Sequence, residues 1–362
     1  LLTLAGVAAL GPWLSAAAGG HRGPAAGAGA MRRLIANENP YGPGPAAQAA
    51  AKRAATLGWR YATSEARQLK AAIADHEGVD TSQVMIGAGS AEILRVAALR
   101  YARDGGEVLT ASPTFSFLPS YARRLGAELN ELPLTDDMAF DLTAIAAAIN
   151  ERTRLVYLCN PNNPTGTRVD GAVVRAFCEQ VSNRVPVLID EAYMDLADDF
   201  AEHTALERVL AGDPVIIART FSKLHGMAGL RVGYALAPAD IIKELEQLRV
   251  TIPSLVGVMA ATASLGDKDF LAFSRAQIRE AMRITPAALD DSARRYTPSF
   301  GNFVLFDAGV PARDFSQAMR SAGSLTGMGY RPYDTWARIS MGKTEDMQAL
   351  AAAMAEYFQA RA

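Results

Sequence analysis

Cysteine and histidine are scarce in this sequence, and their positions exclude several kinds of site. The only cysteines are Cys159 and Cys178, which lie in apolar segments without the spacing of a metal or redox pair. The four histidines are scattered along the chain, also without metal-ligand spacing. No P-loop or nucleophile-elbow pattern occurs. We therefore expect no metal site and interpret both thiols as structural.

An excess of charge of either sign is also missing. The chain carries 36 lysines and arginines against 38 aspartates and glutamates, which gives a formal net charge of -2. A nucleic-acid-binding protein needs a basic face that neutralises phosphates, so we expect no nucleic-acid partner. With 50% hydrophobic residues and 362 residues in all, the chain has the composition of a globular protein and the length for two domains.

The first residues, LLTLAGVAALGPWLSAAAGG, contain no charged side chain. The apolar stretch from Leu1 to Leu14, followed by small residues, resembles the end of a twin-arginine-type export signal. A low-complexity arm or an apolar helix packed on a partner is the alternative, so a cytoplasmic and a periplasmic location both stay open. Glycine and proline interrupt the run, which argues against a stable membrane span.

Short apolar runs alternate with helical stretches between residue 80 and about residue 240. This alternation predicts an α/β fold with a mainly parallel seven-stranded sheet covered on both faces, whose ligand crevice lies at the carboxyl ends of the strands. The expected strands are Gln83–Ile86, Glu107–Thr110, Glu128–Leu132, Leu155–Leu158, Val185–Ile189, Val215–Ala218 and Val232–Leu236. The expected helices between them include Ala91–Arg103, Leu142–Ile149, Gly171–Val181 and Pro238–Leu248.

The pattern changes beyond residue 250 and predicts a second, smaller α/β domain. A long helical stretch is expected over Leu255–Arg295. Strands over Phe303–Phe306 and Ala337–Ser340 and helices over Ala312–Ser321 and Thr344–Ala360 follow. We therefore expect an apolar leader and Gly/Ala-rich linker (1–30), an N-terminal arm joining the small domain (31–50), a large domain (51–254) and a small C-terminal domain (255–362).

A glycine-containing loop, Gly87-Ala88-Gly89-Ser90-Ala91-Glu92, follows the first predicted strand and opens a helix. Exposed N–H groups at a helix N-terminus bind anions, and glycines let a phosphate approach closely. Ser90 is a candidate cap or phosphate ligand. An ordinary glycine turn with a serine cap explains the same residues, so this loop alone does not decide between the two.

Three motifs follow later strands in the order NPNNPTG (160–166), DEAY (190–193) and TFSK (220–223), with Leu230-Arg231 shortly after. Together with ANENPYG (36–42), they resemble fold-type-I pyridoxal phosphate (PLP) enzymes of the aspartate-aminotransferase-like fold. Within that group the chain is similar to class I/II aminotransferases, and closest to the histidinol-phosphate aminotransferase branch. The resemblance covers roughly residues 34–345.

The resemblance implies a role for each motif residue. Lys223 would carry PLP as a Schiff base and move protons during transamination, Asp190 would pair with the pyridine nitrogen, and Tyr193 would hydrogen-bond the phenolic oxygen with help from Asn163. Phe115 would stack on the ring. The residues implied at the phosphate are Gly89, Ser90, Ala91, Ser222 and Arg231, whose planar guanidinium suits bidentate phosphate binding.

Further positions come from the resemblance alone. Tyr61 matches a tyrosine that reaches the cofactor phosphate of a neighbouring subunit, which implies a homodimer with shared active sites. Arg338 matches the arginine that grips a substrate carboxylate or phosphate, and Tyr41 and Arg331 are further substrate-site candidates. The alternatives are a buried aromatic for Tyr61 and a strand-edge surface arginine for Arg338.

The chain departs from the branch pattern near the substrate. Ala91 stands where an acidic residue is usual, Phe115 where tyrosine is common, and only Tyr333–Ala337 separate Arg331-Pro332 from Arg338. We therefore expect an aminotransferase that passes an amino group to a 2-oxo acid such as 2-oxoglutarate, with histidinol phosphate as one candidate donor. A PLP-dependent decarboxylase, lyase or cyclase is the enzymatic alternative, and a non-catalytic amino-acid-sensing domain is a remote one.

Overall fold

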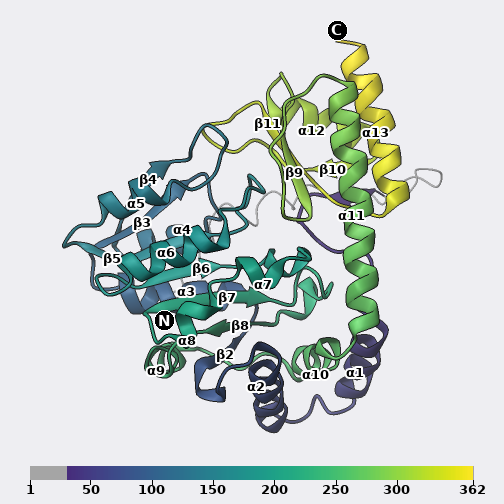
Figure 1. The fold of residues 1–362 in the computed structure, drawn as a ribbon. Coiled ribbons are helices and arrows are strands. Elements are labelled where there is room, and N and C mark those ends of the chain that lie inside the picture. The colour runs from purple at the N-terminus through teal and green to yellow at the C-terminus, as the bar shows by residue number, and fades with distance from the viewer. Residues whose placement is uncertain (1–30, 362) are drawn as a thin grey trace, which may run out of the picture. The chain divides into compact units, whose positions relative to one another are not determined.

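A computed structural model describes residues 31–361 of the chain, and residues 32–361 belong to one unit. Its central element is a seven-stranded sheet with the strand order β2-β8-β7-β6-β5-β3-β4 (Figure 1). Only β8 runs antiparallel to its neighbours, so the predicted mainly parallel sheet is confirmed. The strands are β2 (Val84–Gly87), β3 (Glu107–Ser112), β4 (Glu128–Pro133), β5 (Thr153–Cys159), β6 (Val187–Asp190), β7 (Val215–Thr220) and β8 (Gly233–Leu236).

Successive residues of the central strands alternate between two hydrophobic cores, because side chains along a strand point to opposite faces. On β7, for example, Ile217 belongs to one core and Ile216 to the other. Both faces are therefore covered, which explains why these strands are almost continuously apolar. Helices α3 (Ser90–Ala102), α4 (Phe117–Arg124) and α9 (Ala239–Leu248) cover one face, and α2 (Thr63–Glu77), α5 (Leu142–Ala148), α6 (Gly171–Val181) and α8 (Leu206–Leu210) the other.

The helical stretch expected over Leu255–Arg295 is two helices, so that prediction is wrong in detail. Helix α10 (Leu255–Leu265) packs against α1 (Pro45–Ala55) and α2, and α11 (Lys268–Asp291) runs from there toward the small sheets (Figure 1). The break falls at Gly266 and Asp267. The Asp267 carboxylate accepts a hydrogen bond from the N–H of Phe270 and so caps the start of α11.

Two small sheets complete the chain. Strand β9 (Phe303–Asp307) pairs antiparallel with β11 (Trp336–Ser340), as the sequence predicts in position, and α12 (Ala312–Ser321) and α13 (Thr344–Gln359) pack nearby. Strand β1 (Arg32–Leu34) pairs in parallel with β10 (Ser324–Thr326), which brings the start of the described chain beside its C-terminal part. The sequence did not predict β1, β10, α1, α2, α4, α8 or the short α7 (Phe200–His203).

No helix within residues 31–361 has both the length and the apolar character that crossing a membrane requires. The predicted export signal lies outside the described residues.

Candidate functional site

Three neighbouring parallel strands end at one edge of the central sheet and deliver three of the sequence motifs there. Cys159 at the end of β5 pairs with Asp190 at the end of β6, which pairs with Ala218 on β7. Lys223 follows the end of β7, and the loop 160–166 follows β5. The carboxyl ends of parallel strands form the ligand crevice of such sheets, so the motifs meet where a ligand binds.

The amine of Lys223 is held by the backbone of the N-terminal arm. The Nζ atom donates a hydrogen bond of 2.9 Å to the carbonyl oxygen of Asn37 and lies 5.2 Å from the ring centroid of Tyr193. Burial lowers the pKa of Lys223 to about 8, and the nearby charge of Arg338 acts in the same direction, while Asp190 opposes it. A lysine amine that is partly neutral near neutral pH is suited to nucleophilic attack on a carbonyl carbon.

Asp190 is almost completely buried, with 1% of its surface exposed. Its Oδ1 accepts a hydrogen bond of 3.2 Å from the N–H of Ala192, and its Oδ2 lies 3.5 Å from the hydroxyl of Tyr157. Burial raises the pKa of Asp190 to about 7, although these hydrogen bonds and the charge of Lys223 oppose the rise. A protonated ring nitrogen placed against Asp190 would restore the anionic carboxylate.

Two side-chain amides donate hydrogen bonds to the hydroxyl of Tyr193. It accepts hydrogen bonds from Nδ2 of Asn163 at 3.2 Å and from Nδ2 of Asn37 at 3.0 Å. Burial raises the pKa of Tyr193, so the group keeps its proton. With its oxygen occupied by two donors, the hydroxyl proton is free to donate to a ligand oxygen.

The glycine loop and the arginine after the lysine motif form one corner of the site. A Cβ atom on Gly89, whose φ is +79°, would lie 2.3 Å from Nη2 of Arg231. Arg231 also donates a hydrogen bond of 3.3 Å from Nη1 to Oγ of Ser222. Ser90 and Ala91 open α3, where the first N–H groups have no acceptor within the helix. This corner combines a guanidinium, a hydroxyl and a helix N-terminus, the groups that bind a phosphate.

Arg338 reaches the site from β11. It donates hydrogen bonds from Nη1 to Oδ1 of Asn163 at 2.5 Å and from Nη2 to the carbonyl of Ile35 at 2.8 Å. Its guanidinium lies 5.4 Å from the ring centroid of Phe303 and 5.3 Å from that of Tyr330. Its buried Nε has no hydrogen-bond partner among the described residues, so the side chain retains capacity to bind an anion.

The remaining candidates have other surroundings in the single chain. Phe115 is half-buried and stacks on Phe117, with ring centroids 5.1 Å apart. The hydroxyl of Tyr41 accepts a hydrogen bond from the N–H of Thr344. Arg331 is exposed in a turn of the loop before β11, and Tyr61 is 91% exposed between α1 and α2. Neither Arg331 nor Tyr61 is brought into contact with Lys223 by this chain alone.

His225 lies two residues after Lys223 in the sequence. Its side chain is buried, its Nδ1 is 2.8 Å from Oγ of Ser264, and its ring packs against Phe221. Burial lowers the pKa of His225 to about 3, so the imidazole is neutral at physiological pH.

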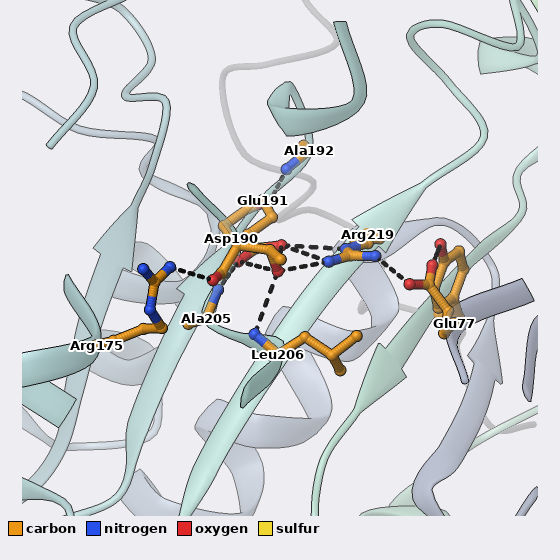
Figure 2. A network of polar contacts seen from close by, with 10 residues as sticks. Glu77, Arg175, Asp190, Glu191, Ala192, Ala205, Leu206 and Arg219 are labelled. Carbon is orange, nitrogen blue, oxygen red and sulfur yellow. Dashed lines mark hydrogen bonds and ion pairs between the residues drawn. The ribbon is translucent and has the colours of Figure 1, made fainter. Parts of the chain in front are cut away.

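A buried ionic network lies beside Asp190 (Figure 2). Arg219, on β7, pairs with Glu191 at 2.8 Å and with Glu77 of α2 at 2.5 Å. Burial alone would raise the pKa of Glu77, but the charge of Arg219 and the hydroxyl of Tyr234 bring it below its usual value. Because Glu191 follows Asp190 directly in sequence, the network ties the ends of β6 and β7 together.

Several residues of this site were not predicted as site residues. In the sequence, Asn37 appeared only as one residue of the motif 36–42. Its contacts with Tyr193 and Lys223 depend on how the N-terminal segment folds against the site. Tyr157 lies within a predicted strand and Arg219 directly after one, and a strand pattern does not indicate which buried polar side chains will lie next to site residues. Glu77, from a helix far away in sequence, gave no signal.

The geometry fits one kind of cofactor. A lysine amine with a lowered pKa, a buried carboxylate, a tyrosine hydroxyl and a corner suited to a phosphate lie together near the carboxyl ends of the central strands. These are the groups that would hold PLP through its aldehyde, ring nitrogen, phenolic oxygen and phosphate. A fold of this class with such a site defines a PLP-dependent enzyme.

Comparisons with known proteins place the chain in a family. Residues 31–354 match the model of the family Aminotransferase class I and II. The chain is 37% identical over 329 residues to a histidinol-phosphate aminotransferase of Moorella thermoacetica, which covers 90% of this chain and 84% of the relative. It is 36% identical over 322 residues to an aromatic amino acid aminotransferase of Mycobacterium bovis, covering 88% and 90% respectively.

A solved structure agrees with these sequences. The histidinol-phosphate aminotransferase from Sinorhizobium meliloti in complex with pyridoxal-5'-phosphate has a TM-score of 0.85 and 31% identity to this chain, with 92% of each chain covered. The chain therefore belongs to the class I and II aminotransferase family and is a PLP-dependent aminotransferase, as its motifs predict.

Proposed function

We propose that this aminotransferase takes the amino group from a donor with an anionic group, foremost histidinol phosphate, and passes it to a 2-oxo acid such as 2-oxoglutarate. The observation that carries this proposal is the position of Arg338, which contacts Asn163 beside the Tyr193 hydroxyl and keeps a buried Nε without a partner. A guanidinium so placed binds a phosphate or carboxylate. Relatives from Moorella and Sinorhizobium are named for histidinol phosphate.

In this proposal each site residue has one task. PLP, when bound, supplies an electron sink for the negative charge left on the substrate's α-carbon. Lys223 would hold the cofactor through its amine and, with that amine free, would move a proton between the substrate's α-carbon and the C4′ carbon of the cofactor. Asp190 would pair with the ring nitrogen, and Tyr193 with Asn163 would hydrogen-bond the phenolic oxygen. Phe115 would cover the ring, and the phosphate would be held by Gly89, Ser90, Ala91, Ser222 and Arg231.

A donor panel tests the substrate. Histidinol phosphate and aromatic, acidic and basic amino acids are each added without acceptor, and the visible band of the bound cofactor, near ~420 nm, is followed. We expect histidinol phosphate to bleach this band and Arg338→Ala to raise its KM at least about tenfold, since a charged hydrogen bond is lost. A response to other donors but none to histidinol phosphate contradicts the proposed donor. Release of CO2 or ammonia without bleaching contradicts transamination.

Aromatic amino acids are the second candidate donors. The observation in their favour is the pair of rings, Phe303 and Tyr330, that flank Arg338, beside a relative named for aromatic amino acids. A ring from the substrate could stack against Tyr330 while its carboxylate binds Arg338. If this candidate is correct, Tyr330→Ala raises the KM for phenylalanine and tyrosine more than the KM for aspartate.

The exposed aromatics between α1 and α2 support a homodimer with shared sites. Trp59 is 83% exposed and Tyr61 is 91% exposed, and neighbouring apolar rings of this size are commonly covered by a partner. In the proposed dimer, Tyr61 reaches the phosphate corner of the other subunit. Arg231 and Ser222 of each chain would then meet a tyrosine that the chain itself does not supply.

Mixing two inactive chains tests this arrangement. The variants Lys223→Ala and Tyr61→Ala are each weakly active or inactive, but a mixed dimer contains one intact site only if Tyr61 serves the partner. Random mixing at equal amounts would then restore about a quarter of wild-type activity, since half of the dimers are mixed and each has one intact site. No recovery, with mixed dimers shown to form, contradicts the shared site.

A further inference from the structure

Asn37 stands out in the N-terminal arm because its backbone adopts a rare conformation in a buried place. Its φ is +52°, in the left-handed region, and 1% of its surface is exposed. Asparagine tolerates this region better than most residues, but a buried left-handed residue persists only where its surroundings hold it. The contacts that hold Asn37 connect three parts of the site.

Every polar group of Asn37 has a partner in the site. The N–H donates to Oγ of Ser340 at 2.8 Å, and Oδ1 accepts from the same hydroxyl at 2.7 Å. Nδ2 donates to the Tyr193 hydroxyl at 3.0 Å, and the backbone carbonyl accepts from Nζ of Lys223 at 2.9 Å. The left-handed conformation lets the carbonyl and the carboxamide of one residue reach two neighbouring catalytic groups.

Ser340 links Asn37 to the strand that carries Arg338. Ser340 and Arg338 are two residues apart on β11, so their side chains project from the same face of the strand. Arg338 in turn donates to Asn163, whose amide also donates to the Tyr193 hydroxyl. Tyr193 is therefore held by two amides, and β11 is tied to each of them through a different side chain.

We propose that Asn37 is a positioning residue that couples β11, the strand of the substrate-binding arginine, to Lys223 and Tyr193. Its carbonyl holds the lysine amine when that amine is not covalently attached. Its carboxamide turns the Tyr193 hydroxyl so that the tyrosine proton points at the cofactor's phenolic oxygen. This inference rests on the proposed roles of Lys223, Tyr193 and Arg338.

Two substitutions at Asn37 separate its side chain from its backbone. Asn37→Gly removes the carboxamide but keeps the carbonyl and adopts a positive φ without strain, whereas Asn37→Ala removes the same group and adds the steric cost of the left-handed region. Ser340→Ala breaks the link to β11 from the other side. Ser324→Ala is the matched control, because Ser324 is also buried on a small-sheet strand and its Oγ accepts from Arg32 rather than from the site.

The first readout is the pH at which the visible absorption of the bound cofactor titrates. Without the Asn37 amide, the Tyr193 hydroxyl is a weaker acid and a weaker donor to the phenolic oxygen. We therefore expect Asn37→Gly and Asn37→Ala to move the midpoint to higher pH by about half a unit or more, the size of one neutral hydrogen bond. Ser340→Ala should move it in the same direction by less, and Ser324→Ala should leave it unchanged.

The charged groups around the site stay in place in these variants. The side chains that act on Lys223 are Asp190, Glu38, Arg231 and Arg338, and those that act on Tyr193 include Arg338, Asp190 and Cys159. None of them is replaced, so a shift reports the loss of hydrogen bonds from Asn37 rather than the loss of a charge.

The second readout is the division of the effect between kcat and KM. We expect Asn37→Gly to lower kcat about tenfold with KM changed less than about twofold, because Arg338 keeps its own contacts. If Asn37→Gly keeps the wild-type titration midpoint and kcat, the proposal is overturned. This holds even if Asn37→Ala is impaired, because backbone strain alone would then explain the loss in Asn37→Ala. A different result would contradict the proposed function itself: Lys223→Ala would still bind the cofactor covalently and turn over substrate.

Discussion

The amine of Lys223 is expected to titrate far below an ordinary lysine, and this is measurable in the cofactor-free protein. Burial lowers its pKa from 10.5 to about 8. At pH 7 the neutral fraction then rises from about 0.03% to about 10%, so the reactive amine is roughly 300-fold more abundant. Capture of PLP by the protein should therefore be fast near neutral pH, with a rate that increases up to about pH 8 and then levels off.

The perturbation is Arg338→Met, which removes a positive charge that lowers the pKa of Lys223. We expect the midpoint of the capture rate to rise by roughly one unit, the usual effect of a nearby like charge. Glu38→Gln should move it in the opposite direction, because Glu38 raises the pKa of Lys223. That shift should be smaller, since Glu38 is partly exposed and paired with Arg33.

The assay is stopped-flow absorbance of cofactor-free protein mixed with PLP at pH values between about 6 and 10. A soluble lysine analogue measured in parallel corrects for the titration of PLP itself. A midpoint near that of free lysine would refute the argument that burial sets the pKa of Lys223. Equal midpoints in the wild type and Arg338→Met would refute the contribution of the arginine.

Three further predictions concern affinity and stability. Gly89→Ala should raise the Kd for PLP at least about tenfold in a fluorescence titration, since its Cβ would lie 2.3 Å from Nη2 of Arg231, and an unchanged Kd would remove Gly89 from the phosphate corner. Arg219→Met should lower the free energy of unfolding in urea by about 3–5 kcal/mol because it leaves buried carboxylates without a counter-charge, whereas Glu77→Gln, which keeps one ion pair, should cost less; equal losses would contradict this account. Ala293→Gly should raise that free energy by about 0.5–1 kcal/mol, because Ala293 is exposed at a φ of +52° after α11, and a loss of stability would contradict the strain.

The order of the motifs and the strand pattern were readable from the sequence because both depend on local properties. Apolar runs such as residues 187–189 are continuous because the sheet is buried on both faces, and this predicts a parallel sheet without knowledge of the contacts. The rule that ligands bind at the carboxyl ends of parallel strands then placed Asp190 and Lys223 in one crevice. Helices α1 and α2 lie before the alternation of strands and helices that begins near residue 80, and the sequence did not predict them. It also merged α10 with α11 across a short capped break.

The sequence by itself determined the class of enzyme and the cofactor, because the motifs follow strands in a fixed order that resembles the family's. Only the tertiary structure decided how the groups are tuned and connected. The burial that shifts the pKa values of Lys223 and Asp190 depends on every element packed around them. The link from Ser340 through Asn37 to Lys223 joins residues that are about 200 to 300 positions apart in the chain, so no local pattern could reveal it.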